Sequence, residues 1–476
     1  MKFNIAKKGG LAAQLVFEDK LEGSYLNHLK EKELFSGKAE EVYYTLDSNL
    51  KAQLFIGLGK EEKIDLEVLR KTFFKAASEL LKNKVEEVEL NIPKLNNLCN
   101  YKTAEAIAEG MLHATYKYDK FKSDRKEQTE ITVNYNPEKG KEDRAEKGIN
   151  EAVKLMEAVF LTRDLVNQPA NVIYPETLAK IAKEKLEAKG VKVTVHGKKE
   201  IEALKMEAFL NVARASTKEP KLIVMEYYNN PGSNEKIALV GKGLTYDSGG
   251  YAIKPATSMV DMFTDMGGSG TVIGAMHALA DLKAKVNVVA VVASCENMIS
   301  GDGYRNGDII GSMSGKTIEI INTDAEGRLT LADAVYYATN NLGATKLIDL
   351  ATLTGACVSA LGEQVSGAVT NNDEFFSELV KANERAGELV WRMPTIEYYK
   401  KMNESKVADL KNSGGKLGGM MTAGLFVGSF LAKEDIPWIH IDIAGTAYIT
   451  EKFGYLKENA TGTLVKSLYY MLSKEA

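Results

Sequence analysis

Six short segments in the later part of the chain are apolar on nearly every residue, and they restrict the possible folds more than any other feature. They cover residues 221–228, 236–243, 286–294, 318–322, 345–353 and 438–445. Strands covered on both faces have this composition, whereas strands with one exposed face alternate apolar and polar residues. Stretches with helical spacing of apolar residues, such as 270–282 and 329–341, lie between several of them. We therefore expect an α/β fold with a largely parallel central sheet flanked by helices.

The first 150 residues differ from the rest in composition. Charged side chains are denser there, most of all between residues 117 and 147, where we expect a surface loop or an edge hairpin. Apolar runs at 52–59 and 85–92 flank a helix expected over 66–81, which predicts a small α/β domain. We expect an amino-terminal domain over 1–150 for assembly or regulation, a connecting helix over 151–168 and a larger carboxy-terminal domain over 169–476. The alternative for the first domain is a binding module for nucleotides or nucleic acid.

Charge and hydropathy exclude several classes of protein. The chain has 61 basic and 65 acidic side chains, a formal net charge of -4, which is too balanced for a protein built around nucleic-acid backbones or anionic lipid. No apolar run reaches the roughly 18 to 20 residues that a membrane span requires. The first twenty residues lack the pattern of a secretory signal. We expect a cytoplasmic protein without membrane contact, with small molecules or peptides rather than nucleic acid as partners.

Charged residues gather where the apolar segments end. Lys242 lies near the end of the segment 236–243, Asp247 and Lys254 follow it among glycines, and Asp265 precedes the helix expected over 270–282. The carboxyl ends of parallel strands meet at one edge of a sheet, where ligands bind. The segment 318–322 leads into three further charged residues, Asp324, Glu326 and Arg328. If that segment stays extended, its spacing of two directs Asp324 and Glu326 to the same side.

Four carboxylates at one sheet edge would repel one another and attract cations. Two divalent ions would balance them, and oxygen-rich ligation without cysteine or histidine suits zinc, manganese, magnesium or cobalt. A bridged pair of such ions can activate a water near neutral pH and polarise a carbonyl. Lys254 and Arg328 would then remain for a developing oxyanion or a bound anion.

Five ordered sequence blocks carry a resemblance to a known family. They are GKGLTYDSGGYAIKP (241–255), DMGG (265–268), NTDAEGRL (322–329), LATLTGA (350–356) and IDIAGTA (441–447). In this order and spacing the chain closely resembles the leucine aminopeptidase (cytosol aminopeptidase) family of dinuclear metallopeptidases, over roughly residues 160–470. The octapeptide matches the signature of that family without a departure. The resemblance makes the carboxy-terminal domain the catalytic one.

The resemblance also implies roles for individual residues. Asp247 and Glu326 would bridge two divalent metal ions, zinc or manganese with cobalt and magnesium as further candidates; Asp324 would complete the first site, and Lys242 and Asp265 the second. Lys254 would polarise the scissile carbonyl, and Arg328 would hold a bicarbonate that acts as general base. The backbone at Leu353 and Gly355 would contact the substrate, and Met262 and Ala444 would line an apolar pocket for its first side chain. The expected activity is removal of leucine-like amino-terminal residues from peptides by a metal-activated water, in a homohexamer.

Dinucleotide binding is the alternative for the carboxy-terminal domain. The glycine-rich stretch 267–274 opens a helix, and helix amino-termini bind phosphate. Gly268, Gly270 and Gly274 do not have the spacing of the dinucleotide fingerprint, however.

Overall fold

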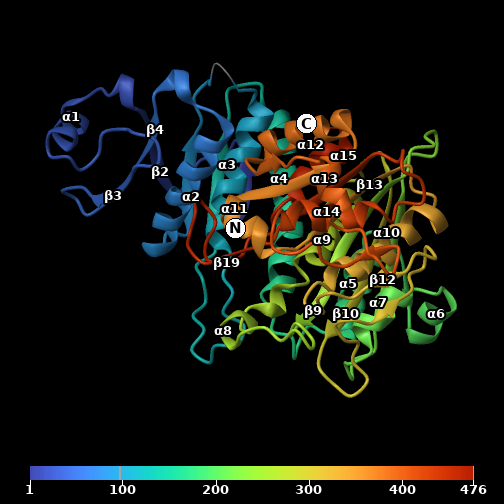
Figure 1. Cartoon of the computed structure of the whole chain (residues 1–476). Helices are drawn as coiled ribbons and strands as arrows, with labels where there is room; N and C mark the ends of the chain where they lie inside the picture. The colour runs from blue at the N-terminus through green and yellow to red at the C-terminus, as the bar shows by residue number, and fades with distance from the viewer. Residues whose placement is uncertain (96–97, 475–476) are drawn as a thin grey trace. The chain divides into compact units, whose positions relative to one another are not determined.

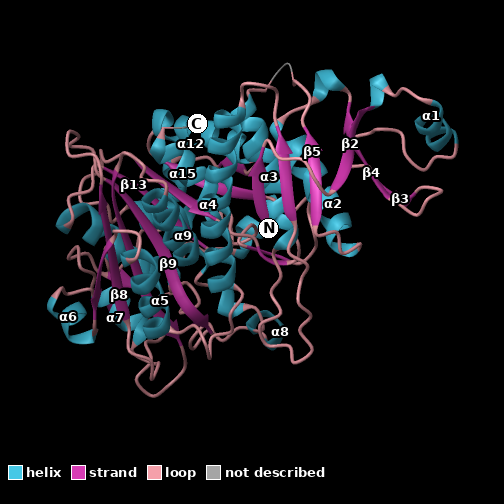
Figure 2. Cartoon of the chain, turned by 180° about the vertical axis from the view of Figure 1, so that it is seen from behind, coloured by secondary structure: helices cyan, strands magenta, loops and turns pink. Residues whose placement is uncertain are grey.

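The computed structural model describes residues 1–95 and 98–474, and it divides into two compact units (Figures 1 and 2). Unit 1 contains Met1–Glu157 and Lys452–Lys457, and unit 2 contains Ala158–Glu451 and Glu458–Ala476. Helix α4 (Glu142–Val166) crosses from one unit into the other. The helix expected over 151–168 is therefore the second part of a longer helix that begins at Glu142.

Unit 1 is built on a six-stranded sheet with two long helices. The strand order is β1-β6-β5-β2-β4-β3, and all pairs are parallel except β3 with β4. Helix α2 begins after Asp65, whose side chain accepts a hydrogen bond from the backbone N–H of Val68 at 2.7 Å, as N-cap residues do. It approaches α3 so closely that a Cβ on Gly110 would lie 2.3 Å from the backbone oxygen of Arg70. The bounds are β1 (Lys2–Ile5), β2 (Leu11–Phe17), α1 (Ser24–Glu31), β3 (Val42–Leu46), β4 (Ala52–Gly59), α2 (Leu66–Lys82), β5 (Glu87–Asn91), α3 (Asn100–Thr115) and β6 (Thr132–Asn136).

The prediction of a surface loop or edge hairpin over 117–147 is wrong for its second half. Strand β6 lies between β1 and β5 inside the sheet, and α4 begins within the same segment. The alternating residues Val133 and Tyr135 are buried in the core of unit 1. Two apolar residues among many charged ones gave too weak a pattern to identify a buried strand.

Unit 2 contains the mostly parallel sheet expected from the apolar segments. Its strand order is β15-β14-β17-β13-β9-β10-β8-β7, and the central strands β17, β13, β9 and β10 are parallel. Five of the six apolar segments form adjacent strands of this sheet, from β17 to β8. The bounds are β7 (Lys192–His196), β8 (Lys221–Tyr228), β9 (Ile237–Asp247), β10 (Asn287–Asn297), β13 (Lys346–Ala351), β14 (Val365–Thr370), β15 (Leu389–Arg392) and β17 (Trp438–Asp442).

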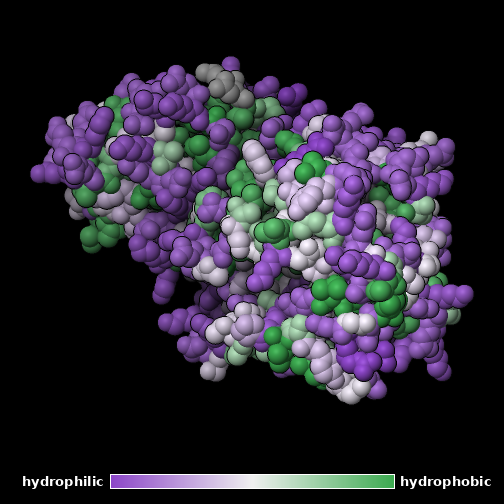
Figure 3. Space-filling view, in the orientation of Figure 1, coloured by the Kyte–Doolittle hydropathy of each residue, from purple (hydrophilic) through white to green (hydrophobic). Residues whose placement is uncertain are grey.

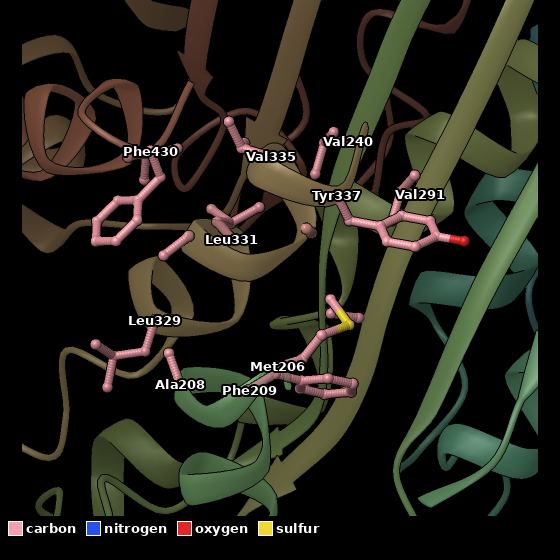
Figure 4. Packing of buried hydrophobic residues seen from close by; sticks show 14 of the residues in the cluster. Met206, Ala208, Phe209, Val240, Val291, Leu329, Leu331, Val335, Tyr337 and Phe430 are labelled. Carbon is pink, nitrogen blue, oxygen red and sulfur yellow. The ribbon is translucent and has the colours of Figure 1, made fainter. Parts of the chain in front are cut away.

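Helices cover both faces of this sheet (Figure 2). On one face lie α5 (Pro175–Glu187), α9 (Gly267–Asp281), α12 (Asp373–Ala386) and α15 (Val465–Ser473); on the other lie α7 (Glu207–Ala213), α10 (Gly327–Tyr336) and α14 (Gly419–Gly428). Successive residues of β9 face the two helix layers in turn, because side chains alternate between the two faces along a strand. Val240 packs in the core beneath α10, as Figure 4 shows, whereas a Cβ on Gly241 would lie 2.7 Å from the backbone oxygen of Gly268 in α9.

The core between α7, α10 and the sheet fixes where α10 begins (Figure 4). Phe209 of α7 and Leu331 and Val335 of α10 are almost completely buried in the same hydrophobic cluster as Val240 and Val291. Burial of side chains of this size contributes roughly 1.5–3 kcal/mol each. The amino end of α10 is thereby held beside the carboxyl half of β9.

The segment 318–322 is not a strand of the main sheet, which corrects the sequence prediction. Only Ile318–Glu319 forms a strand, β12, between β11 (Ile309–Ile310) and β16 (Leu410–Lys411) in a small separate sheet. The chain then turns, because Asn322 accepts a hydrogen bond from the backbone N–H of Asp324 at 3.0 Å. Glu326 has helical backbone angles and directly precedes α10, so the expected extended geometry of Asp324 and Glu326 is wrong.

Short elements complete unit 2. They are α6 (Lys198–Ala203), α8 (Ala256–Met259), α11 (Gly355–Leu361), α13 (Glu397–Lys401), β18 (Tyr448–Ile449) and β19 (Asn459–Ala460), and a π-helical turn over Tyr337–Asn341 extends α10. The face of the molecule in Figure 3 is mostly hydrophilic, with hydrophobic residues in separate small patches. Within residues 1–95 and 98–474, no helix has both the length and the apolar character needed to cross a membrane.

Candidate metal centre

The five predicted metal ligands lie around the carboxyl half of β9 and the starts of α9 and α10. Lys242 and Asp247 belong to β9, Asp265 precedes α9 and Glu326 precedes α10. The Nζ atom of Lys242 lies 2.8 Å from Oδ2 of Asp265 and 2.9 Å from Oε1 of Glu326. Asp247, Asp265 and Glu326 each offer a carboxylate oxygen, and these atoms lie within 4.8 Å of one another. All four residues are buried.

Lys254 connects Asp247 with the fifth predicted ligand, Asp324. Its Nζ atom lies 2.8 Å from Oδ2 of Asp247 and 2.5 Å from Oδ1 of Asp324. The chain returns to the cluster through a turn after β9 in which Gly249 and Gly250 have φ of 86° and 63°. A Cβ on Gly249 would lie 2.9 Å from Oδ1 of Asp324, so a larger residue would disturb the cluster directly.

Two polar side chains at other strand ends orient these carboxylates. Asn297, the last residue of β10, donates a hydrogen bond to Oδ1 of Asp247 at 2.8 Å. Thr352, which follows β13, donates its hydroxyl hydrogen to Oδ1 of Asp265 at 2.8 Å. In each carboxylate one oxygen is held by the protein and the other, Oδ2, faces a lysine of the cluster. The sequence analysis missed both residues, because neither stands out from other polar residues in its local sequence.

The cluster is strongly coupled electrostatically. Burial raises the pKa of Asp265 to about 8, although the charge of Lys242 opposes the shift. Burial and the neighbouring charge of Asp247 raise the pKa of Glu326 and of Asp324 above their ordinary values. Burial disfavours the charge on Lys242, but the surrounding carboxylates outweigh it and raise the pKa of this lysine. In this structure, the ammonium groups of the lysines supply the positive charge that balances the carboxylates.

The donor set fits divalent cations. Oε2 of Glu326 is buried and has no hydrogen-bond partner among the described residues. Oδ2 of Asp265 and Oδ1 of Asp324 are also buried without a hydrogen bond in the described chain, and they meet only lysine ammonium groups in ion pairs. Buried carboxylate oxygens left in this condition are unfavourable unless a cation binds them. Hard divalent ions favour carboxylate oxygen, and a lysine joins such a set as the neutral amine.

Arg328 is a buried cation at the start of α10. Its Nη1 atom donates a hydrogen bond to the backbone oxygen of Asn412 at 2.8 Å, and burial lowers its pKa to about 10. Its Nε atom is buried and has no hydrogen-bond partner in the described part of the chain. A guanidinium with a donor left over in a buried position is suited to hold a small anion.

The structure ties two of the predicted substrate contacts to one carboxylate. The backbone N–H groups of Leu353 and Ala444 donate hydrogen bonds to Oδ1 of Asp442 at 3.2 and 3.1 Å. Asp442 is the buried last residue of β17, and sequence reasoning did not identify it. Met262 begins the short turn that leads into α9, and Gly355 is the first residue of α11.

Buried carboxylates and a lysine at the edge of a mostly parallel sheet are suited to a metal-dependent hydrolase, the class of enzyme in which bound divalent ions activate water. Comparison with known families places the chain within this class. The model of the cytosol aminopeptidase family catalytic domain matches residues 160–469, and the model of its N-terminal domain matches residues 4–125. The chain belongs to the cytosol aminopeptidase family, and it is a metal-dependent aminopeptidase that acts on peptides.

Individual relatives match this chain over nearly their full length. A probable cytosol aminopeptidase of Treponema denticola is 98% identical over 476 residues and is covered completely, as is this chain. A probable cytosol aminopeptidase of Clostridium tetani is 49% identical, with 99% of this chain and 98% of the relative covered. Among solved structures, a mutant of tomato leucine aminopeptidase has a TM-score of 0.88 at 33% identity, covering 100% of this chain and 96% of its own. The bottromycin maturation enzyme BotP in complex with Mn has a TM-score of 0.89 at 28% identity, covering 98% and 99%.

Proposed function

We propose that the cluster holds two divalent metal ions, with Asp247 and Glu326 shared between them. Asp324 completes one site, and Lys242 and Asp265 complete the other. The single observation that carries this proposal is the group of buried carboxylate oxygens from Asp247, Asp265 and Glu326 within 4.8 Å of one another. When bound, a pair of divalent ions supplies a water nucleophile at neutral pH and polarises the substrate carbonyl.

The remaining charged residues act on the substrate and on protons. Lys254 directs its ammonium group at the oxygen of the scissile carbonyl and stabilises the charge that develops there. Arg328 would hold a bicarbonate, which would supply a general base when bound. Two features support these roles: Lys254 already lies between two of the carboxylates, and Arg328 has an N–H without a partner in the described chain.

The substrate is a peptide with a leucine-like amino-terminal residue. The backbone at Leu353 and Gly355 contacts the peptide, and Met262 and Ala444 line the apolar pocket of its first side chain. Because Asp442 already accepts the N–H of Leu353, we propose that the carbonyl group of Leu353 makes the contact. Because the same carboxylate oxygen of Asp442 also accepts the N–H of Ala444, it holds this pocket residue close to Leu353.

Removal and replacement of the metal test the proposed function. Purified protein is expected to contain two divalent ions per chain, and dialysis against a chelator should abolish hydrolysis of leucine p-nitroanilide. Zinc or manganese should restore the activity, with cobalt and magnesium as the further ions to compare. Full turnover by protein shown to be free of metal would refute the proposal.

Metal binding is expected to weaken as the pH falls. Asp265, with a pKa of about 8, and Lys242, with a raised pKa, hold protons that ligation must release. Each released proton costs about a tenfold loss of affinity for every pH unit below the pKa. Isothermal titration of metal-free protein between pH 6.5 and 8.5, in buffers of different ionisation enthalpy, measures both affinity and proton release. A pH-independent affinity would contradict the proposed ligands.

The surroundings of the catalytic unit complete the proposal. The protein is a cytoplasmic homohexamer in which the domain before helix α4 serves assembly or regulation and the domain after it carries catalysis. Large exposed apolar side chains of unit 2, such as Leu389, Trp391 and Tyr398 at 55%, 65% and 59% exposure, support an association between subunits.

A further inference from the structure

We propose that Asn412 is a positioning residue that holds the metal-binding loop 321–325 in shape before any metal binds. The inference rests on the proposed ligand set, because Asp324 belongs to this loop. Asn412 lies far from the loop in sequence, directly after strand β16. No sequence block of the family resemblance contains it.

The side chain of Asn412 uses all of its hydrogen-bonding capacity on this loop. Its Oδ1 atom accepts hydrogen bonds from the backbone N–H groups of Ile321 at 2.8 Å and Asn322 at 3.2 Å. Its Nδ2 atom donates to the backbone oxygens of Asn322 at 2.7 Å and Ala325 at 3.4 Å. A side-chain amide has two donor hydrogens and an oxygen with two lone pairs, so none remains for water. The side chain is completely buried.

Side chains hold this loop because it has no regular secondary structure of its own. Within residues 321–325 one backbone–backbone hydrogen bond is present in the described chain, from the N–H of Ala325 to the oxygen of Asn322 at 3.1 Å. Asn297 and Tyr304 donate to the backbone oxygen of Thr323 at 3.0 and 2.8 Å, and Asn412 holds the residues on either side of Thr323. Asn412 binds both the backbone N–H and the backbone oxygen of Asn322. The side chain of Asn322 in turn accepts a hydrogen bond from the backbone N–H of Asp324. Asn412 therefore influences the position of Asp324 indirectly, through the hydrogen bonds of Asn322.

Asn412 also contacts the second functional group of this region through its backbone. Its carbonyl oxygen accepts the hydrogen bond from Nη1 of Arg328, and its N–H donates to the backbone oxygen of Glu319 at 3.0 Å. The pairing of β16 with β12 thus brings Asn412 beside both Asp324 and Arg328. One residue sets the distance between a proposed metal ligand and the proposed anion-binding guanidinium.

An aspartate at this position would have the same shape but the wrong hydrogen-bonding groups. It would keep the acceptor for Ile321 and Asn322 but place an oxygen against the backbone oxygens of Asn322 and Ala325. The variant Asn412→Asp therefore removes the two donated bonds and adds a buried negative charge, whereas Asn412→Ala removes all four bonds without adding a charge. Replacing a residue that orients a metal ligand without contacting the metal itself typically lowers metal affinity 10- to 100-fold.

The chain offers a matched control at the opposite end of the main sheet. Asn287, at the amino end of β10, accepts a hydrogen bond from the N–H of Asn230 at 3.0 Å and donates to the backbone oxygens of Asn230 and Ser233 at 2.8 and 3.1 Å. It also is buried, and it also holds a loop. Asn287→Asp introduces the same chemical change where no predicted metal ligand lies.

The experiment measures zinc affinity and amide exchange in four proteins: wild type, Asn412→Asp, Asn412→Ala and Asn287→Asp. We expect zinc competition against a chromophoric chelator to show one of two sites weakened at least about tenfold in both Asn412 variants, and unchanged in Asn287→Asp. Hydrogen exchange of the metal-free proteins should show protected amides at Ile321 and Asn322 in the wild type, and faster exchange at these amides in Asn412→Ala.

Each result decides between the proposals. Two wild-type zinc sites with equal affinities in the Asn412 variants would overturn the positioning role and leave the metal centre intact. A wild type that binds no zinc would instead refute the proposed ligands. If the Asn412 variants do not fold, the wild-type exchange measurement still decides, because unprotected amides at Ile321 and Asn322 in metal-free protein would overturn the inference.

Discussion

Replacing Asp324 by asparagine or Glu326 by glutamine is expected to abolish turnover through loss of metal. Either change removes a negative charge from a ligand while leaving its shape nearly the same. Because Glu326 is completely buried and shared between both proposed sites, its replacement should reduce metal content below one ion per chain. Without the two metal ions the water nucleophile would not be activated, and kcat should fall by at least about 10³-fold. Metal analysis and leucine p-nitroanilide hydrolysis on the same samples check both effects.

Asp261→Asn is the control for these substitutions. Asp261 lies four residues before the proposed ligand Asp265, but its side chain is exposed. Its replacement should leave metal content and kcat at wild-type values. Wild-type metal content together with wild-type activity in both Asp324→Asn and Glu326→Gln would refute the ligand assignment.

Replacing Lys254 by alanine is expected to leave both metals bound while turnover drops by about 10²- to 10³-fold. Lys254 pairs with Asp247 and Asp324, and burial opposes its charge although these carboxylates raise its pKa overall. Removing the ammonium group leaves the carboxylates free for divalent ions, so metal affinity should not decrease. The loss should fall on kcat, because the ammonium group is proposed to act on charge that develops only in the transition state.

Lys416→Ala provides the comparison, since Lys416 is an exposed lysine with no proposed role. Metal content, kcat and KM are measured for both variants with leucine p-nitroanilide. An unchanged kcat in Lys254→Ala would show that this lysine does not take part in the reaction. A loss of metal in the same variant would assign Lys254 to the metal site instead of the substrate.

Much of the catalytic fold was predictable from local composition. The five apolar segments that form β8, β9, β10, β13 and β17 are adjacent in the sheet, and strands buried on both faces are apolar at most positions. That rule was enough to bring Lys242, Asp247 and Asp265 to one edge. It failed for 318–322, because β12 pairs with β16 over only two residues and the chain then turns at Asn322.

The residues that orient the site could not be predicted in the same way. Asn297 and Thr352 contact carboxylates 50 and 87 residues away, and Asn412 and Asp442 contact loops 90 and 89 residues away. Each is an ordinary polar residue in its local sequence. A hydrogen bond between distant segments leaves no periodic pattern in either of them.

The sequence by itself determined the class of chemistry, because acidic residues and lysines interrupt apolar segments whose burial forces their ends to one sheet edge. Only the tertiary structure decided how that chemistry is arranged: which carboxylate oxygens face the lysines, that Glu326 starts a helix, and that buried amides and carboxylates of distant segments hold the loops. The physical reason is that burial follows from local composition, whereas the direction of a side chain depends on hydrogen-bond partners that only the folded chain brings together.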